Sequence, residues 1–367
     1  MKVLILTPLF FGDSSGAAVY YKILANSFIQ SGYAVSVISD KETGEFQGQY
    51  YGLLPSRCGR EKRFPRDVFA YAIQNLKYLS IPKIIRYEQP NTLLVHSSFY
   101  NHPGAFASMM NMVRKRFSEL TMVLDVRDRL VPAKQVKSFS IFDCVIACSE
   151  NIMLHLCRHG LIKEQVTLIP VVQEKIDVDK QEAWEFTRSL KLKPLTYIFY
   201  AGLVKEAKGI SVLLDAFLNY VKAVRPDVKL VISGLLKTQN ERVLSALKED
   251  GVAYLGNRKR SDVLKLMSCA RLCVNLSPIE GMPRTSLESL ALQKPTILPP
   301  NVPEFGRHCP DFVALDSNPK AVADKIIELL DTQAVPSYPI ENHLPENVLP
   351  KYMAILSLNS SSMGRHS

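Results

Sequence analysis

The sequence predicts an α/β fold made of two Rossmann-like domains, each built on a parallel sheet. The chain has 367 residues, 47% of them hydrophobic, and at about 150 residues per domain this length gives two domains that each bury a core. In both halves, short apolar runs alternate with segments of helical periodicity, and this alternation favours parallel sheets with helical crossovers. A polar, charged stretch at 173–193 is the expected linker between domains at 1–172 and 194–340.

The first domain opens with a continuous apolar run at Val3–Leu6, which is typical of a parallel strand buried on both faces. Apolar residues at helical spacing follow over 17–31 and stop at Gly32, a residue common after helix ends. A helix over 67–88 should break at Pro82, because proline removes a backbone donor. The other strands of this domain are expected at 34–38, 92–96, 121–125, 144–147 and 166–169.

The second domain repeats the scheme, with short apolar runs between segments whose apolar residues recur every three or four positions. Its expected strands lie at 197–201, 229–233, 253–255, 272–276, 296–298 and 312–314. Its expected helices lie at 209–224, 239–249, 261–269, 284–292 and 319–331. A last apolar-periodic segment at 348–358 follows a Pro-rich crossover, and we expect the tail 359–367 to be disordered.

Composition excludes several classes of protein. No run of about 18 apolar residues occurs, so we expect no transmembrane helix. The seven cysteines are odd in number and follow no disulfide or metal spacing, and we expect core thiols in a cytoplasmic protein. The net charge of +10 lies mostly in the first half, which implies an anionic partner there, either a membrane surface or a phosphorylated substrate. No nucleic-acid-binding pattern accompanies the charge, so we expect no nucleic acid partner.

Ligands of open α/β sheets bind at the carboxyl ends of strands, and two loops stand at such ends. The first, 12–16, is not G-x-G-x-x-G and therefore lacks the dinucleotide fingerprint. Its small residues let backbone amides, including that of Gly16, approach a phosphate or a sugar. A tight turn between strand and helix explains the same residues, and this alternative stays open.

The second loop, 277–288, holds two carboxylates around the start of a helix. Glu280 lies beyond the strand, Pro283 suits the first helical turn, and Glu288 follows about one turn into the helix. The partial positive charge of a helix N-terminus suits a pyrophosphate, and carboxylates accept hydrogen bonds from vicinal hydroxyls. The pattern therefore suits a nucleotide sugar, with Glu280 at the sugar and Glu288 at the ribose. The alternative is a loop acid and a helix residue that are both solvated.

The segment Glu280–Glu288 (EGMPRTSLE) resembles the E-x7-E motif of retaining glycosyltransferases of family 4. Tyr200-Ala201-Gly202 followed by Lys208-Gly209 also matches that family, and the similarity covers most of the chain. The resemblance implies the GT-B fold, in which two Rossmann-like domains with parallel sheets face each other across a cleft. It also implies that the last helix, here 346–358, packs back on the first domain.

The resemblance implies the site residues as well. Its catalytic residues are Glu280 and Lys208. Its donor-binding residues are Gly16, Gly202, Lys205, Arg258, Gly281, Met282, Pro283, Arg284, Thr285 and Glu288. His96, Arg127 and Asp128 lie at the predicted strand ends of the first domain, which places them toward the cleft, and we assign them to acceptor binding. For Asp128 the alternative is a loop residue that pairs with Arg127 or Arg129. Leu203 stands where members usually carry an arginine against the donor diphosphate, and Lys205 is the candidate to replace that contact. Members need no bound metal, so we expect neither a metal nor a cofactor.

The implied activity is a retaining, metal-independent transfer of a sugar from a nucleotide-sugar donor to a hydroxyl of a glycan acceptor. Asp125–Asp128 (DVRD) resembles a D-x-R-D segment of a branch that acts on lipid-linked bacterial glycans. We therefore expect a lipid-linked acceptor and a role in surface polysaccharide synthesis, as for lipopolysaccharide or capsule. The alternatives are a catalytically silent GT-B protein that binds a nucleotide, a glycosyltransferase with a soluble small-molecule acceptor, and a nucleotide-dependent oxidoreductase.

A basic cluster in the first domain suggests where the protein works. The cluster consists of Arg57, Arg60, Lys62, Arg63 and Arg66, and aromatic and apolar residues follow it. Each cation near an anionic leaflet contributes about 1 kcal/mol of binding, so we expect a peripheral position on an anionic membrane surface, at the inner face of the cell membrane. The alternative is that the apolar residues face the core and the charges are solvated.

Overall fold

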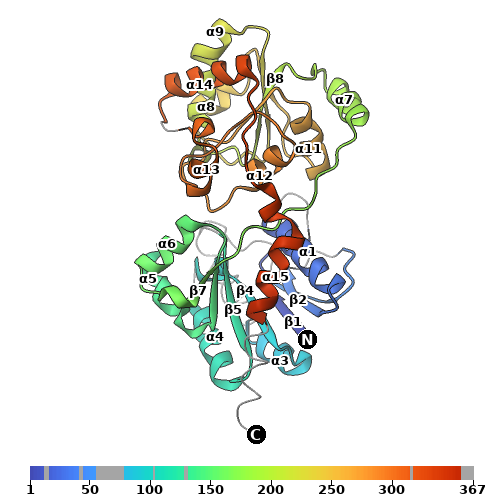
Figure 1. The fold of residues 1–367 in the computed structure, drawn as a ribbon, viewed down its shortest axis with the longest axis vertical. Coiled ribbons are helices and arrows are strands. Elements are labelled where there is room, and N and C mark those ends of the chain that lie inside the picture. The colour runs from blue at the N-terminus through green and yellow to red at the C-terminus, as the bar shows by residue number, and fades with distance from the viewer. Residues whose placement is uncertain are drawn as a thin grey trace. The chain divides into compact units, whose positions relative to one another are not determined.

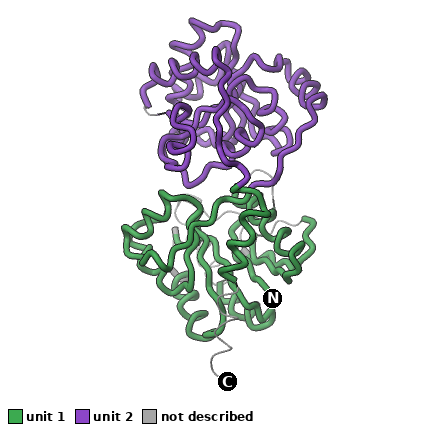
Figure 2. The backbone as a smooth tube through the Cα atoms, viewed as in Figure 1, with its two compact units in different colours: residues 1–172, 342–367 green, residues 173–341 purple. Residues whose placement is uncertain are grey.

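The computed structural model describes residues 1–11, 16–40, 44–54, 78–101, 104–127, 131–314 and 317–356. The chain divides into two compact units, shown in Figure 2. Unit 1 comprises Met1–Val172 and Asn342–Ser367, and unit 2 comprises Gln173–Glu341. The chain therefore leaves unit 1, completes unit 2 and returns to unit 1 for its last helix.

Unit 1 is built on a parallel sheet of seven strands in the order β3-β2-β1-β4-β5-β6-β7. The strands are β1 (Lys2–Leu6), β2 (Ala34–Asp40), β3 (Gln49–Leu54), β4 (Thr92–His96), β5 (Thr121–Val126), β6 (Cys144–Ala147) and β7 (Val166–Leu168). All but β3 lie where the sequence predicts strands. The β3 strand was missed because it is an edge strand with a mixed sequence (QYYGLL), whose described side chains are only partly buried, so it shows no continuous apolar run.

Helices cover this sheet (Figure 1). They are α1 (Gly16–Gln30), α3 (Ile81–Glu88), α4 (Gly104–Arg116), α5 (Ala133–Val136) and α6 (Glu150–Arg158). Helix α3 begins at Ile81, so Pro82 lies in its first turn, where the missing backbone donor costs nothing. The expected break at Pro82 is therefore the start of a helix. Residues 55–77, which hold the rest of the expected helix and the whole basic cluster, lie outside the described residues.

The last helix, α15 (Pro345–Leu356), belongs to unit 1 and packs against α1. Figure 1 shows the red α15 next to the blue α1, although hundreds of residues separate them in the sequence. The buried face of α15 contains Val348, Tyr352, Ile355 and Leu356. The aromatic ring of Tyr352 meets that of Phe28 edge to face, with 5.8 Å between the ring centres. The expected disordered tail lies outside the described residues.

Unit 2 is built on a parallel sheet of five strands in the order β10-β9-β8-β11-β12. The strands are β8 (Tyr197–Ala201), β9 (Lys229–Ser233), β10 (Val252–Tyr254), β11 (Leu272–Val274) and β12 (Thr296–Ile297). Successive residues of β8 alternate between two hydrophobic clusters, with Ile198 and Tyr200 in one and Tyr197 and Phe199 in the other. This alternation shows that both faces of the sheet are covered, as expected of a parallel sheet.

The helices of unit 2 are α7 (Lys180–Ser189), α8 (Ile210–Ala216), α9 (Lys222–Val224), α10 (Glu241–Ala246), α11 (Arg260–Ser268), α12 (Arg284–Ala291), α13 (Pro303–His308) and α14 (Pro319–Thr332). Two expectations need correction. The stretch 173–193 is not a plain linker, because it contains α7, which Asp179 caps and which buries Ala183 in the core of unit 2. The stretch 312–314 is not a strand, because only a single bridge joins Val313 to Leu298. None of the described helices is long and apolar enough to cross a membrane.

Candidate functional site

Two glycines shape the carboxyl edge of the unit 2 sheet. Gly202 follows β8 and Gly234 follows the neighbouring β9. A Cβ atom on Gly234 would lie 1.7 Å from the carbonyl oxygen of Gly202, so only glycine fits this crossing. Beyond these glycines, the two segments that follow β8 and β9 pair once more, through a parallel bridge between Val204 and Leu236. Their next residues are Lys205 and Lys237, so two lysines extend from the edge where the sequence predicts the donor diphosphate.

Lys208 and Glu280 form an ion pair at the same edge. Gly209 follows Lys208 with φ +74°, and a Cβ atom there would lie 2.5 Å from the carbonyl oxygen of Leu276. This close approach brings Lys208 next to the loop after β11. The Lys208 Nζ atom lies 2.6 Å from the Glu280 Oε1 atom, and the two side chains are 29% and 17% exposed. The two catalytic candidates are therefore in contact and still accessible to a ligand.

The loop that carries Glu280 is held by polar contacts. The Asn275 side-chain oxygen accepts a hydrogen bond of 3.0 Å from the Ser277 backbone N–H. The Asn301 side chain donates to the Glu280 backbone oxygen over 2.9 Å. Pro283 is the N-cap of α12, which begins at Arg284 as predicted. Gly281, Met282 and Pro283 are buried, while Thr285 is partly exposed. The backbone of this loop thus leads into the N-terminus of α12, where a helix favours negative charge.

Glu288 is not the solvated helix residue of the alternative reading. It is 4% exposed, and its Oε1 atom accepts a hydrogen bond of 2.8 Å from the Arg260 Nε atom. The Arg284 Nη2 atom lies 3.6 Å from the same oxygen. A buried carboxylate needs such cationic partners, because an isolated buried charge is costly. Glu288, Arg284 and Arg260 therefore form one buried cluster.

The two arginines of this cluster differ in their electrostatics. Burial lowers the pKa of Arg284, although Glu288 works in the opposite direction. For Arg260, burial also opposes the charge, but the carboxylates of Glu288 and Glu174 raise its pKa overall. The Arg260 Nη1 atom lies 3.3 Å from the Glu174 Oε2 atom. Arg260 was missed by sequence reasoning, which selected only Arg258 from the run Arg258–Arg260. The Arg258 Nε atom donates to the Leu255 carbonyl at the end of β10.

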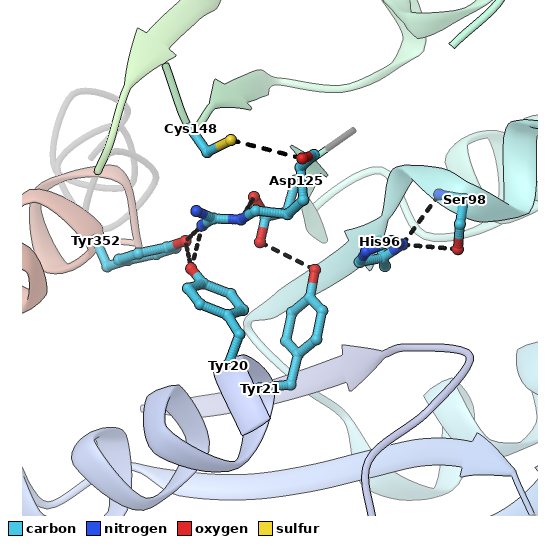
Figure 3. Close-up of polar contacts among 8 residues, drawn as sticks. Tyr20, Tyr21, His96, Ser98, Asp125, Cys148 and Tyr352 are labelled. Atoms are coloured by element: carbon cyan, nitrogen blue, oxygen red, sulfur yellow. Dashed lines mark hydrogen bonds and ion pairs between the residues drawn. The ribbon is translucent and has the colours of Figure 1, made fainter. Parts of the chain in front are cut away.

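The unit 1 candidates lie in a different setting. His96 ends β4 and is 5% exposed, and its Nδ1 atom accepts a hydrogen bond of 3.0 Å from the Ser98 backbone N–H (Figure 3). Burial, and then the charge of Arg127, lower the pKa of His96 to about 3. His96 is therefore a neutral side chain across the physiological pH range.

Arg127 is committed to contacts inside unit 1. Its Nε atom lies 2.6 Å from the Asp125 Oδ1 atom, and its side chain is only 10% exposed. Its Nη2 atom donates to the hydroxyls of Tyr20 on α1 and Tyr352 on α15, and these two hydroxyls also bond to each other. Tyr21 donates to Asp125 over 2.9 Å (Figure 3). The Arg127 guanidinium thus joins α1 and α15 through their tyrosines, and its contact with an acceptor stays a prediction.

The remaining expected contacts fall on exposed or undescribed positions. Gly16 is the first residue of α1 and is exposed. Asp128 lies outside the described residues, as do the five residues of the basic cluster. Within the described ranges, no group of three or more His, Cys, Asp or Glu side chains is placed to hold a metal ion.

Family models match both halves of the chain. Residues 14–171 match the model described as Glycosyltransferase Family 4, and residues 180–344 match the model described as Glycosyl transferases group 1. Together the two matches cover most of the sequence and divide it much as the two units do. No curated protein matches the chain by sequence.

Several solved structures share the fold over nearly their whole length. Anabaena HepE in complex with UDP and glucose aligns with a TM-score of 0.68 at 14% identity, covering 99% of this chain and 98% of that one. The sucrose-phosphate synthase of Thermosynechococcus elongatus gives 0.70 at 16% identity, with 99% and 98% covered. The lipopolysaccharide outer core galactosyltransferase WaaB gives 0.64 at 13% identity, with 98% of each chain covered. The predicted fold class of two Rossmann-like domains with parallel sheets is thereby confirmed.

Proposed function

We propose that this chain, a GT-B glycosyltransferase with a family 4-like domain and a group 1 domain, transfers a sugar from a nucleotide-sugar donor to a hydroxyl of a glycan acceptor. The observation that carries the proposal is the accessible ion pair between Lys208 and Glu280, beside the N-terminus of α12. The solved complexes of HepE with UDP, glucose and UDP-glucose support a nucleotide-sugar donor of the same kind.

In this proposal the donor binds along the carboxyl edge of the unit 2 sheet. Lys208 and Lys205 neutralise the diphosphate, together with the backbone of Gly202 and of the loop Gly281–Pro283 at the start of α12. Glu280 holds the sugar. Glu288 accepts hydrogen bonds from the ribose, with Arg284 beside it, and Arg258 lies on the side of the base.

We further propose that the transfer retains the configuration at the anomeric carbon. The acceptor hydroxyl attacks from the face that the diphosphate leaves, so that the new glycosidic bond forms as the bond from the anomeric carbon to the phosphate oxygen breaks. The departing phosphate oxygen takes the proton of the acceptor. Glu280 then stabilises the developing positive charge on the sugar ring, and Lys208 stabilises the developing negative charge on the leaving group. The anomeric configuration of the product, read by NMR coupling constants, tests this step.

The proposed acceptor is lipid-linked, in the synthesis of a bacterial surface polysaccharide. The likeness to WaaB, named as a lipopolysaccharide outer core galactosyltransferase, supports this class. The likeness to sucrose-phosphate synthase instead favours a soluble acceptor. Assays with both acceptor classes separate these candidates.

Slow donor hydrolysis is the simplest test of the activity itself. The purified protein is incubated with UDP-, GDP- and ADP-sugars, and free nucleoside diphosphate is measured without an acceptor. We expect release from one donor, because a site that cleaves the bond between the sugar and the diphosphate also admits water as a slow acceptor. A catalytically silent GT-B protein would bind the nucleotide and release none.

A further inference from the structure

We propose that Arg260 is a positioning residue, which is held by Glu174 and in turn fixes the carboxylate of Glu288 for the ribose hydroxyls of the donor nucleotide. This inference rests on the proposed function, because it concerns the same nucleotide. It adds two residues, Arg260 and Glu174, to which neither the sequence motif nor the family likeness assigns a role.

The contacts of Glu288 are uneven between its two oxygens. The Oε1 atom accepts from Arg260 Nε at 2.8 Å and faces Arg284 Nη2 at 3.6 Å. At 3.6 Å the second contact is an ion pair without a good hydrogen bond, so Arg260 alone fixes the direction of the carboxylate. The Oε2 atom makes no hydrogen bond or ion pair with the residues that the structure describes. One oxygen is thus anchored and the other is left for a hydroxyl donor.

The guanidinium of Arg260 is fixed by two carboxylates on different nitrogens. Its Nε atom bonds to Glu288, and its Nη1 atom lies 3.3 Å from Glu174 Oε2. Because the guanidinium is planar and rigid, two such contacts fix its rotation as well as its position. The Glu174 side chain is 50% exposed whereas that of Glu288 is 6% exposed. Arg260 therefore links a surface carboxylate to a buried one.

The third nitrogen of Arg260 is left unsatisfied. Its Nη2 atom is buried and has no hydrogen-bond partner among the described residues. A buried donor without a partner costs about 1–3 kcal/mol. The guanidinium therefore keeps the orientation that serves Glu288 and Glu174, although that orientation leaves its third nitrogen without a protein acceptor.

The test compares a nucleoside diphosphate with its 2′-deoxy form. The probe is UDP, GDP or ADP, whichever binds the wild-type protein most tightly, and calorimetry gives both dissociation constants. We expect the wild type to prefer the ribose form about tenfold, because the 2′-hydroxyl donates to a charged acceptor. In Glu288→Gln and in Arg260→Gln this ratio should fall to about two or less. A merely structural role of Arg260 would weaken both ligands equally and leave the ratio unchanged.

Two further variants make the outcome decisive. Arg225→Gln removes a matched arginine whose ion pair with Asp331 lies on the surface of unit 2, and it should keep the wild-type ratio. Glu174→Gln changes only the half-exposed carboxylate that holds Arg260. It replaces Arg260→Gln in the test if that variant has a lowered melting temperature. We expect it to reduce the ratio of the two dissociation constants at least twofold. If the preference for ribose is lost in Glu288→Gln but unchanged in Arg260→Gln and Glu174→Gln, the positioning role of Arg260 is overturned. The ribose contact of Glu288 then stands. A wild type without preference overturns the ribose contact itself, and with it this part of the proposed function.

Discussion

Lys208 and Glu280 neutralise each other at the edge of the unit 2 sheet, yet both side chains keep access to solvent. A partly exposed ion pair contributes only about 0–1 kcal/mol to folding. The pair is therefore expendable for stability, and a diphosphate that approaches Lys208 can replace the carboxylate as its partner. Glu280 is then released toward the sugar.

Replacing Lys208 tests this exchange. Lys208→Ala should lower kcat about 10²- to 10³-fold, the usual effect of losing one preorganised electrostatic contact. The melting temperature should fall by no more than about 2–4 °C, the shift that 1 kcal/mol gives in a domain of this size. Lys222→Ala is the matched control, because this lysine of unit 2 is 33% exposed and paired with Asp250, as Lys208 is paired with Glu280. If kcat of Lys208→Ala stays within about threefold of wild type, Lys205 or another group neutralises the leaving diphosphate.

Variants of Glu280 and Glu288 should change different kinetic constants. Glu280→Gln should reduce kcat more than it weakens nucleoside diphosphate binding, because its contact with the sugar strengthens in the transition state. Glu288→Ala should instead raise the KM of the donor, because ribose contacts are equal in ground and transition states. Steady-state kinetics and nucleotide titrations measure both quantities, and the opposite pattern would exchange the two roles.

Sequence reasoning found the site residues that lie close together along the chain. The motif Glu280–Glu288 and the pair Lys208-Gly209 both follow strands, and parallel strands of one sheet end at one edge. It failed where partners lie far apart. The contact of Arg260 with Glu174 joins positions 86 residues apart, and that of Arg127 with Tyr352 joins positions 225 apart. Such partners depend on packing that no local pattern encodes.

At the scale of elements, the strands buried on both faces were the most predictable, since they are continuous apolar runs. The helix α4 (Gly104–Arg116) was missed although its sequence carries the pattern. Phe106, Met109, Met110 and Val113 recur at i, i+3, i+4 and i+7, the spacing of one helix face, and all four are buried. The missed α7 is largely polar and exposed, and it resembles a linker in composition.

The contact between Arg127, Asp125 and Tyr352 holds α15 to the body of unit 1. Arg127→Met should destabilise the protein by about 3–5 kcal/mol, because Asp125 would remain buried without its counter-charge. The double variant Arg127→Met, Asp125→Asn should recover part of this loss, since it removes the orphaned charge as well. Tyr352→Phe should cost only about 1 kcal/mol, the value of one hydrogen bond. Urea unfolding measures all three, and equal losses in the single and double variants would contradict the buried-charge argument.

At the scale of the whole molecule, we predict that the protein binds an anionic membrane surface. We expect co-sedimentation with anionic but not neutral vesicles, because clustered cations bind anionic lipid at about 1 kcal/mol each. Added salt should weaken the binding by screening. Changing Arg60, Lys62 and Arg63 to Ser should abolish most of it. A second basic run, Arg114–Arg116, ends α4 in the same unit. Arg114 is paired with Asp143, whereas Lys115 and Arg116 are exposed, so Lys115→Ser with Arg116→Ser should weaken binding further.

Equal recovery of the wild type and the triple variant with anionic vesicles at low salt would exclude the basic cluster. That result would favour the soluble acceptor. A control variant with Arg225→Ser, on unit 2, should bind vesicles as the wild type does.

The return of the chain to unit 1 has a consequence for synthesis on the ribosome. Unit 2 is one continuous stretch, Gln173–Glu341, so it can fold as soon as it has left the exit tunnel. Unit 1 is translated first but must wait, because Tyr20 finds its partner Tyr352 only 332 residues later. During that interval the apolar face of α1 lacks the helix that covers it. A nascent chain of this protein therefore completes its second unit before its first, and chaperones that bind exposed apolar surface should act on its N-terminal segment.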